Sequence, residues 1–138
     1  MNKCFFAVFF FLFSINVFAT EVIVNVNNID SASGNISIGF CTNEAEFLEQ
    51  KPVAYGFTIP ASKGSISKVV DVPSGSYAII VYHDTNGDKI LNKGMFGKPT
   101  EQYGFSNNKF GAFGKKPPFQ DALFNVESTG TVINIDLR

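Results

Sequence analysis

The chain has 138 residues, of which 11 are basic and 12 acidic, so its formal net charge is −1 at neutral pH. This balance excludes a protein basic enough overall to recruit nucleic acid or an anionic membrane. The single histidine has no second imidazole and no thiol at ligand spacing, which argues against a transition-metal site.

Residues 1–19 predict a secretory signal peptide. One lysine precedes about fourteen largely apolar residues, and Val17-Phe18-Ala19 satisfies the small-residue rule of signal peptidase. The apolar run is shorter than the roughly 18 to 20 residues that span a bilayer, so we expect cleavage after Ala19 rather than a retained anchor. The mature chain is therefore expected outside the cytoplasm, either periplasmic or secreted, and without a membrane span.

Residues 20–138 predict a single domain, because a chain of this length buries roughly 65% of its unfolded surface around one core. Removal of the signal peptide takes Cys4 with it and leaves ten basic against twelve acidic side chains, a formal net charge of −2. Cys41 is then the only cysteine, so no intramolecular disulfide is expected. A thiol at the end of a strand-like segment is typically buried and unreactive.

Apolar and polar residues alternate through most of the mature chain, a pattern typical of strands. The first two candidate strands flank the turn-like sequence NNIDSASGN and are expected to form a hairpin. Pro73 and Gly75 predict a tight turn between two later strands. In chain order, the expected strands are 22–26, 36–41, 53–59, 65–72, 76–83, 121–126 and 131–137. This pattern predicts an antiparallel β-sandwich of about seven strands, immunoglobulin-like or transthyretin-like, with a small β-barrel as the alternative.

One segment, TNEAEFLEQK at residues 42–51, has the features of a helix. Thr42 or Asn43 suits the N-cap, Glu46 stands three residues after Asn43 as in a capping box, and the acidic first turns favour the helix dipole. A helix of about ten residues is marginal alone, so we expect one or two turns that cross an edge of the sandwich.

The strand at 76–83 is apolar on both faces and is expected at the centre of a sheet. A loop of about 35 residues, 84–118, follows it. Loops of this length in compact domains are usually functional or disordered. Its aromatic residues favour an ordered loop that docks on the sandwich, and its glycines permit the bends that docking requires.

Three segments of the chain carry a family resemblance: SGSYAIIVYHDTNGD with its core YAIIVYHD, then GKPTEQYGFSNN, then PPFQDALFNV with FQDALF. They resemble a family of small secreted bacterial proteins known only as a domain of unknown function. The family pattern runs roughly P-x-G-x-Y-A-h-x-V-x-H-D-x-[DN]-x-[DN]-G-x-L-D, then G-x-P-x-E-x-Y-G-F-S-N, then F-x-D-A-x-F, where h is apolar. The resemblance covers essentially the whole mature chain and implies a secreted β-sandwich-like domain without an established activity. Lys89 stands where the pattern usually has glycine, and Asn92 where it usually has aspartate.

The start of the loop spaces oxygen-bearing groups two residues apart, as a calcium loop does. The candidate ligands are Asp84, Asn86, Asp88, the carbonyl of Ile90, and Asn92. The EF-hand pattern also requires glycine at its sixth position and a bidentate glutamate at its twelfth, and here these are Lys89 and Met95. Two alternatives stay open: a weak Ca²⁺ site, and an Asx-rich turn whose side chains cap backbone amides, which we favour. No other cofactor is expected.

The same loop contains the side-chain types of a hydrolase: His83, Asp84, Glu101 and Ser106. Consecutive residues of a strand point to opposite faces, so His83 and Asp84 do not orient each other without a bend. No G-x-S-x-G elbow surrounds Ser106. We therefore do not expect an enzyme, and a hydrolase that uses His83 and Ser106 is the least favoured alternative.

The segment EQYGFSNN, residues 101–108, combines a carboxylate, amides, aromatic rings and a hydroxyl, the mixture that recognises sugars or peptides. We expect a non-catalytic binding or interaction module, and a weakly calcium-stabilised structural domain as its alternative. The sequence does not identify the partner, and a glycan and a peptide are the open candidates. The candidate ligand-binding residues are His83, Glu101, Tyr103, Phe105, Ser106 and Asn107. The competing interpretation is that the two rings pack beneath the loop while the polar residues close turns.

Overall fold

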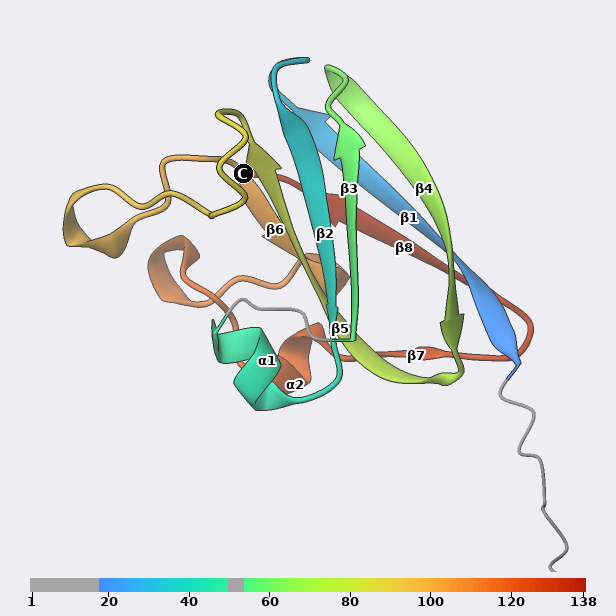
Figure 1. Cartoon of the computed structure of the whole chain (residues 1–138). Helices are drawn as coiled ribbons and strands as arrows, with labels where there is room; N and C mark the ends of the chain where they lie inside the picture. The colour runs from blue at the N-terminus through green and yellow to red at the C-terminus, as the bar shows by residue number, and fades with distance from the viewer. Residues whose placement is uncertain (1–17, 50–53) are drawn as a thin grey trace, which may run out of the picture.

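The computed structural model describes residues 18–49 and 54–138 of the chain. Its strands form two open sheets packed face to face, with strand orders β4-β1-β8 and β3-β2-β5-β6, while β7 pairs with one end of β5 (Figure 1). The expected all-β sandwich is confirmed, and no closed barrel forms within the described ranges. Residues 1–17 of the expected signal peptide and Val53, the expected first residue of a strand, lie outside the described residues.

The three-stranded sheet consists of β1 (Ala19–Ile29), β4 (Gly64–Pro73) and β8 (Thr131–Asp136). β1 lies in the centre and pairs antiparallel with β4 and parallel with β8. Val22, Val24 and Val26 are fully buried and lie on the inner face, because alternate residues of a strand share a face.

The second sheet has five strands. Its continuous path consists of β2 (Asn35–Cys41), β3 (Tyr55–Pro60), β5 (Gly75–Asp84) and β6 (Tyr103–Phe105), and neighbouring strands are all antiparallel. β7 (Phe124–Val126) pairs antiparallel with the first residues of β5. β3 forms one edge of the sheet. β5 lies between β2 and β6, as its two apolar faces predict.

The expected hairpin between the first two strands is wrong, because β1 and β2 lie in different sheets. Each strand has one strongly apolar face, and these faces bury more surface when they meet across the sandwich than when they lie side by side. The chain crosses between the sheets through residues 30–34. Gly34 adopts a φ of +70°, and a Cβ there would lie 2.0 Å from the carbonyl oxygen of Asp84, so only glycine fits this crossing.

The expected strand at 121–126 is also partly wrong. Residues Phe119–Ala122 form a short helix, α2, and only Phe124–Val126 extend as β7. Pro117 and Pro118 precede the helix, and proline is favoured at a helix start. Phe119 and Ala122, three residues apart on one helical face, are both buried, so packing of that face selects helix over strand.

The helix α1 (Glu44–Glu49) has the capping that the sequence predicts. The side-chain oxygen of Asn43 accepts from the Glu46 N–H at 3.0 Å, and the Glu46 carboxylate accepts from the Thr42 N–H at 2.7 Å. The Thr42 backbone hydrogen bond holds the pKa of the Glu46 carboxyl below its usual value. At the other end of α1, the Lys116 ammonium donates to the carbonyls of Phe47 and Leu48 at 2.5 and 2.9 Å and so caps the helix.

The loop at 84–118 contains more regular structure than the sequence indicates. It includes β6 and three single turns of 3₁₀ helix, η1 (Met95–Gly97), η2 (Ser106–Asn108) and η3 (Ala112–Gly114). β6 is three residues long with a glycine in the middle, so it gives almost no alternation signal. Gly104 is needed there, because a Cβ would lie 2.7 Å from the Ile135 side chain.

The domain has two apolar cores. The first lies between the sheets and includes Phe40, Ile79 and Val81. The second lies on the outer face of the five-stranded sheet and is covered by α1, α2 and the loop; its buried members are Cys41, Phe47, Ala78, Ile80, Phe105, Phe119 and Ala122. Burial raises the pKa of the Cys41 thiol to about 11, so this cysteine is an inert core residue as expected.

Candidate functional site

The predicted site residue His83 lies at the end of β5 with its side chain inside the domain, 1% exposed. Its Nε2 donates to the carbonyl of Ser33 at 2.7 Å, and its Nδ1 lies 3.4 Å from the side-chain oxygen of Gln102. The backbone N–H of His83 also donates to the Gln102 carbonyl at 2.9 Å. The imidazole therefore joins the crossing at residues 30–34 to the segment before β6.

Glu101 is a buried brace of the loop, 9% exposed. One carboxylate oxygen accepts from the N–H and the hydroxyl of Thr85 at 3.0 and 3.2 Å. The other accepts from the N–H of Asn92 at 3.0 Å. Both ends of the segment 85–92 are thus fixed by one side chain, which leaves that carboxylate few free lone pairs for a ligand.

Tyr103 and Phe105 lie on β6 and face the second core. The Tyr103 hydroxyl donates to the carbonyl of Gly114. The Phe105 ring is 1% exposed and contacts the rings of Phe47 and Phe110, at centroid distances of 5.8 and 5.5 Å. The structure therefore places these rings beneath the loop, as the competing interpretation of the sequence has it.

Ser106 and Asn107 connect β6 to α2 and the residue after it. The buried Ser106 hydroxyl accepts from the Ile79 N–H at 2.9 Å and donates to the Ala122 carbonyl at 2.5 Å. The Asn107 amide donates to the carbonyls of Asp121 and Leu123 at 3.1 and 2.8 Å. Ile79 precedes His83 by four residues of β5, about 13 Å of strand, so the structure does not bring His83 and Ser106 together.

The five predicted calcium ligands lie on one turn that is closed by its own hydrogen bonds. The Asp84 carboxylate accepts from the N–H groups of Gly87 and Lys89 at 2.8 and 2.9 Å. The Asn86 side-chain oxygen accepts from the Asp88 N–H at 3.1 Å. Further contacts join the Asp88 carboxylate to the Ile90 N–H and link the side chains of Asn86, Asp88 and Asn92 at 2.8–3.0 Å.

These hydrogen bonds, the side-chain amide of Asn92 first, hold the pKa of the Asp88 carboxyl below its usual value. Within the described ranges, no group of three or more His, Cys, Asp or Glu side chains is arranged to hold a metal ion. The turn explains the spacing of these residues without a metal, and calcium binding stays a prediction.

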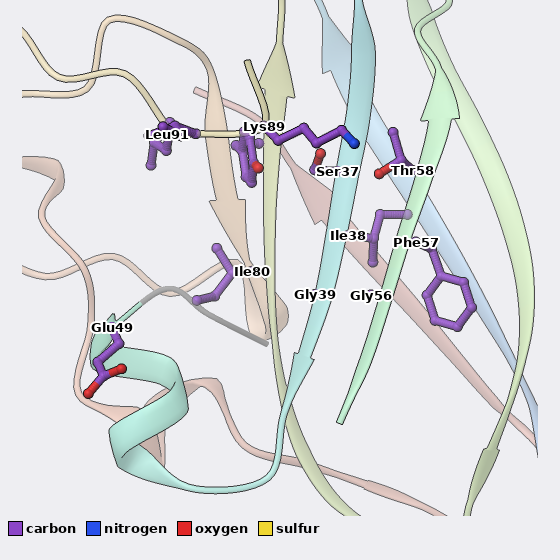
Figure 2. A pocket seen from close by; sticks show the side chains of 12 residues that line it. Ser37, Ile38, Gly39, Glu49, Gly56, Phe57, Thr58, Ile80, Lys89 and Leu91 are labelled. Carbon is purple, nitrogen blue, oxygen red and sulfur yellow. The ribbon is translucent and has the colours of Figure 1, made fainter. Parts of the chain in front are cut away.

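A groove that the sequence did not predict lies on the outer face of the five-stranded sheet, beyond the second core (Figure 2). It has a volume of about 520 Å³. Its floor is open because Gly39 and Gly56 are register partners on β2 and β3, and neither has a side chain. Ser37, Thr58, Ile80 and Tyr82 share this face of the sheet, and Lys89, Ile90 and Leu91 form the wall on the loop side.

Lys89 is the one cation among the described residues that line this groove. In Figure 2 its side chain extends across the groove in the direction of Ser37 and Thr58, both of which line it. Its backbone has a φ of 63°, in the left-handed region that favours glycine. This explains why the family pattern usually has glycine at the position. The sequence shows Lys89 as a departure from the family pattern, but a binding role for this lysine can be inferred only from its position in the groove.

Tyr82 contributes a neutral hydroxyl to the same groove. Burial raises the pKa of its phenol above the usual value, and the carboxylates of Asp84, Glu101 and Asp88 raise it further, whereas a hydrogen bond with Ser37 lowers it. The described lining of the groove therefore combines an apolar floor, three hydroxyls, one lysine and the carboxylate of Glu49.

A family model described as an uncharacterized protein conserved in bacteria (DUF2141) matches residues 24–134. This agrees with the resemblance carried by the three sequence segments. No curated protein and no solved structure matches the chain. Among the described residues, no helix has the length and apolar character needed to cross a bilayer.

Ser106→Ala tests whether this serine is a brace of the fold. The substitution leaves the buried Ile79 N–H and Ala122 carbonyl without their partner, so we expect a loss of about 1–3 kcal/mol in the free energy of unfolding, measured by urea denaturation. Ser128→Ala, at an exposed turn, is the control and is expected to stay within about 0.5 kcal/mol. Equal stability of the two variants would contradict the bracing role.

Proposed function

The chain belongs to this uncharacterized bacterial family, and we propose that it is an extracytoplasmic, non-catalytic binding module whose groove takes a small ligand with an apolar body and an acidic group. The observation that carries the proposal is the open groove on the outer sheet face, with Lys89 across it. Its volume of about 520 Å³ lies within the range of ligand sites.

The chemistry of the groove favours an acidic ligand over a neutral one. Ile80, Leu91 and the paired glycines offer apolar contact, and the ammonium of Lys89 offers a charge-assisted hydrogen bond. Glu49 lies at the end of the groove next to α1, so the acidic group is expected at the Lys89 end. Acidic peptides and acidic glycans, members of the two partner classes expected from the sequence, both satisfy this chemistry.

The non-catalytic part of the proposal is supported by the contacts of His83 and Ser106. Each side chain is buried and bonded to backbone groups of the domain: His83 lies near the end of β5, whereas Ser106 lies in η2 and is bonded to Ile79, four residues earlier in β5. A hydrolase needs its base and its nucleophile within hydrogen-bond reach of each other. The lining of the groove includes neither residue.

The groove is tested with 8-anilinonaphthalene-1-sulfonate, an apolar aromatic anion whose fluorescence rises on binding. Gly56→Val is expected to abolish saturable binding, because it fills the floor, while the fold is retained: a Cβ at Gly56 meets nothing within 4 Å, and valine is favoured in strands. Lys89→Gln is expected to weaken binding about tenfold through loss of the charged hydrogen bond. Lys63→Gln is the control, because it removes the same charge from an exposed bend between β3 and β4 that does not line the groove.

Undiminished binding of the probe by Gly56→Val, with its unfolding curve unchanged, would refute the groove as the site. Competition against the bound probe then ranks acidic peptides and acidic glycans. Neutral counterparts of the same ligands are expected to compete at least about tenfold more weakly, since they lack the partner of Lys89.

The extracytoplasmic part of the proposal predicts a mature chain that begins at Thr20. Thr20 of β1 pairs with Val72 of β4, and its side chain is 8% exposed. Its hydroxyl lies 3.3 Å from the hydroxyl of Ser74. Cleavage after Ala19 therefore removes only the first residue pair between β1 and β4, Ala19 with Pro73. Intact-mass measurement on protein expressed from the full gene in a bacterial host is expected to show loss of residues 1–19. A cell-associated product of full mass would contradict the cleavage.

Calcium-dependent stabilisation is the second candidate function. The observation that favours it is that side-chain oxygens of Asp88 and Asn92 both lie within 3.0 Å of the Asn86 side-chain nitrogen, so two predicted ligand oxygens converge on one point. Rotation of the Asn86 amide by half a turn would bring its oxygen to the same point. A Ca²⁺ ion that binds the folded state is expected to raise its stability by about 2.7 kcal/mol at a hundredfold excess over the dissociation constant.

Thermal unfolding with and without millimolar calcium measures this effect. Asp88→Ala is expected to remove the stabilisation, and Asp71→Ala on β4 is the control for loss of a carboxylate elsewhere. An unchanged melting temperature in calcium, with magnesium giving the same curve, would leave the Asx-rich turn as the whole explanation of the spacing.

A further inference from the structure

Two turns of the loop are copies of each other. The first is Gly94-Met95-Phe96-Gly97-Lys98 and the second is Gly111-Ala112-Phe113-Gly114-Lys115. In each, the N–H of the first glycine donates to the carbonyl of the lysine at 2.8 Å. In each, the phenylalanine is in the left-handed region, with φ, ψ of 64°, 16° and 57°, 31°. The repeat therefore extends from the sequence to the backbone conformation.

The two turns project aromatic rings into solvent on one side of the molecule. Phe96 and Phe113 are each 100% exposed, and Met95 is 82% exposed. Both phenylalanines border one hollow of about 510 Å³, and Figure 1 shows η1 and η3, gold and orange, on the side of the sandwich that carries α1 and α2. Single exposed apolar residues are common on protein surfaces, but two fully exposed rings on turns of the same conformation indicate an interaction surface.

The backbone conformation of these turns is not explained by packing within the domain. A left-handed φ is unfavourable for a residue with a bulky side chain, whereas glycine adopts it freely. A fully exposed ring gains no burial in return. Strained positions of this kind cluster at sites that contact a ligand or partner.

Positive charge surrounds the two turns. Residues 89–116 contain six lysines and one acidic residue, Glu101, whose carboxylate is buried and hydrogen-bonded. The rest of residues 20–138 contains four basic and eleven acidic residues. The charge of the whole chain is near neutral and therefore does not describe the charge of this surface. Lys93, Lys98 and Lys115 are exposed beside the rings.

We propose that the twin turns, residues 94–98 and 111–115, form a peripheral attachment surface for an anionic lipid bilayer. Phe96, Phe113 and Met95 would enter the boundary between headgroups and acyl chains, where aromatic rings are favoured, and the lysines would contact lipid phosphates. The full exposure of both rings on protruding turns fits a flat boundary better than a small-molecule pocket, which encloses its aromatic walls.

Two neighbouring features set the strength of this attachment. Lys116 contributes less to lipid binding than the exposed lysines, because its ammonium caps α1. Its pKa is also lowered to about 8, first by burial and then by the charge of Lys93. α1 also carries Glu44, Glu46 and Glu49, whose carboxylates oppose binding to anionic lipid. The rings must therefore supply much of the affinity. The proposal does not depend on the groove beside Lys89.

The first test measures co-sedimentation of the mature protein with vesicles of phosphatidylglycerol and phosphatidylcholine, against phosphatidylcholine alone. Binding is expected to the anionic vesicles. The double variant Phe96→Gly/Phe113→Gly is expected to bind at least about tenfold more weakly, the size expected for losing buried aromatic surface. It is also expected to keep its melting temperature, because glycine suits both backbone positions. Val69→Ala/Val132→Ala, which shortens exposed side chains on the other sheet, is the control and is expected to bind normally.

The second test separates charge from insertion. Lys98→Gln/Lys115→Gln is expected to weaken vesicle binding about fivefold per lysine, and the effect is expected to shrink in high salt. Lys63→Gln/Lys68→Gln is the charge-matched control. The chain contains no tryptophan, so Phe113→Trp provides a single reporter whose emission is expected to shift to the blue on vesicles and to be quenched by brominated lipid.

Three outcomes would overturn the proposal. One is no binding to phosphatidylglycerol vesicles, and another is equal binding by the double glycine variant. The third is binding of soluble polyglutamate as strong as binding of the anionic vesicles, together with an unshifted emission of the Phe113→Trp variant on the vesicles. That result would assign the surface to an acidic polymer instead.

Discussion

One strand, β5 (Gly75–Asp84), is buried on both faces, and the rest of the domain is arranged around that requirement. Tyr77, Ile79 and Val81 face the core between the sheets, and Ala78 and Ile80 face the second core. Strands with two apolar faces need a covering layer on each side. The three-stranded sheet covers the first face. The second is covered by α1, α2 and the loop, which is why a segment of about 35 residues with little secondary structure is ordered.

Because the loop is a structural layer, its polar side chains act as braces. Glu101 fixes the segment 85–92, Ser106 joins β5 to α2, and His83 holds the crossing at residues 30–34. Buried polar groups are costly unless they are hydrogen-bonded, and within the described ranges no buried side-chain nitrogen or oxygen lacks a partner. The residue types that suggested a ligand site in the sequence are thus accounted for by the fold. Surfaces available to a partner lie where this cover ends, beside Lys89 and at the tips of η1 and η3.

The sequence predicted what depends on local pattern. Alternation located most strands, the double-sided run identified the central one, and Asn43 with Glu46 predicted the helix cap. It did not predict what depends on distant pairing. Period-two alternation assigns faces but not partners, so the two-sheet separation of β1 and β2 was missed. The groove depends on Gly39 meeting Gly56 across two strands, which no local signal encodes. The twin turns differ from these cases. The repeated G-x-F-G-K pattern is present in the sequence, whereas the exposure of its phenylalanine rings is seen only in the structure.

Backbone strain connects the two proposed surfaces. Six non-glycine residues of the described chain have positive φ, and three are asparagines, which tolerate that region at small cost. The other three are Lys89, Phe96 and Phe113, where glycine would avoid a cost of about 1–2 kcal/mol each. None of the three repays this cost through burial, since Lys89 is exposed and both rings are fully exposed. Each instead presents its side chain on a surface that a partner can reach.

Leu91 borders the groove and also the hollow between the twin turns, so the two surfaces are neighbours on one segment. A domain attached to a bilayer through its twin turns would therefore carry its groove close to the membrane.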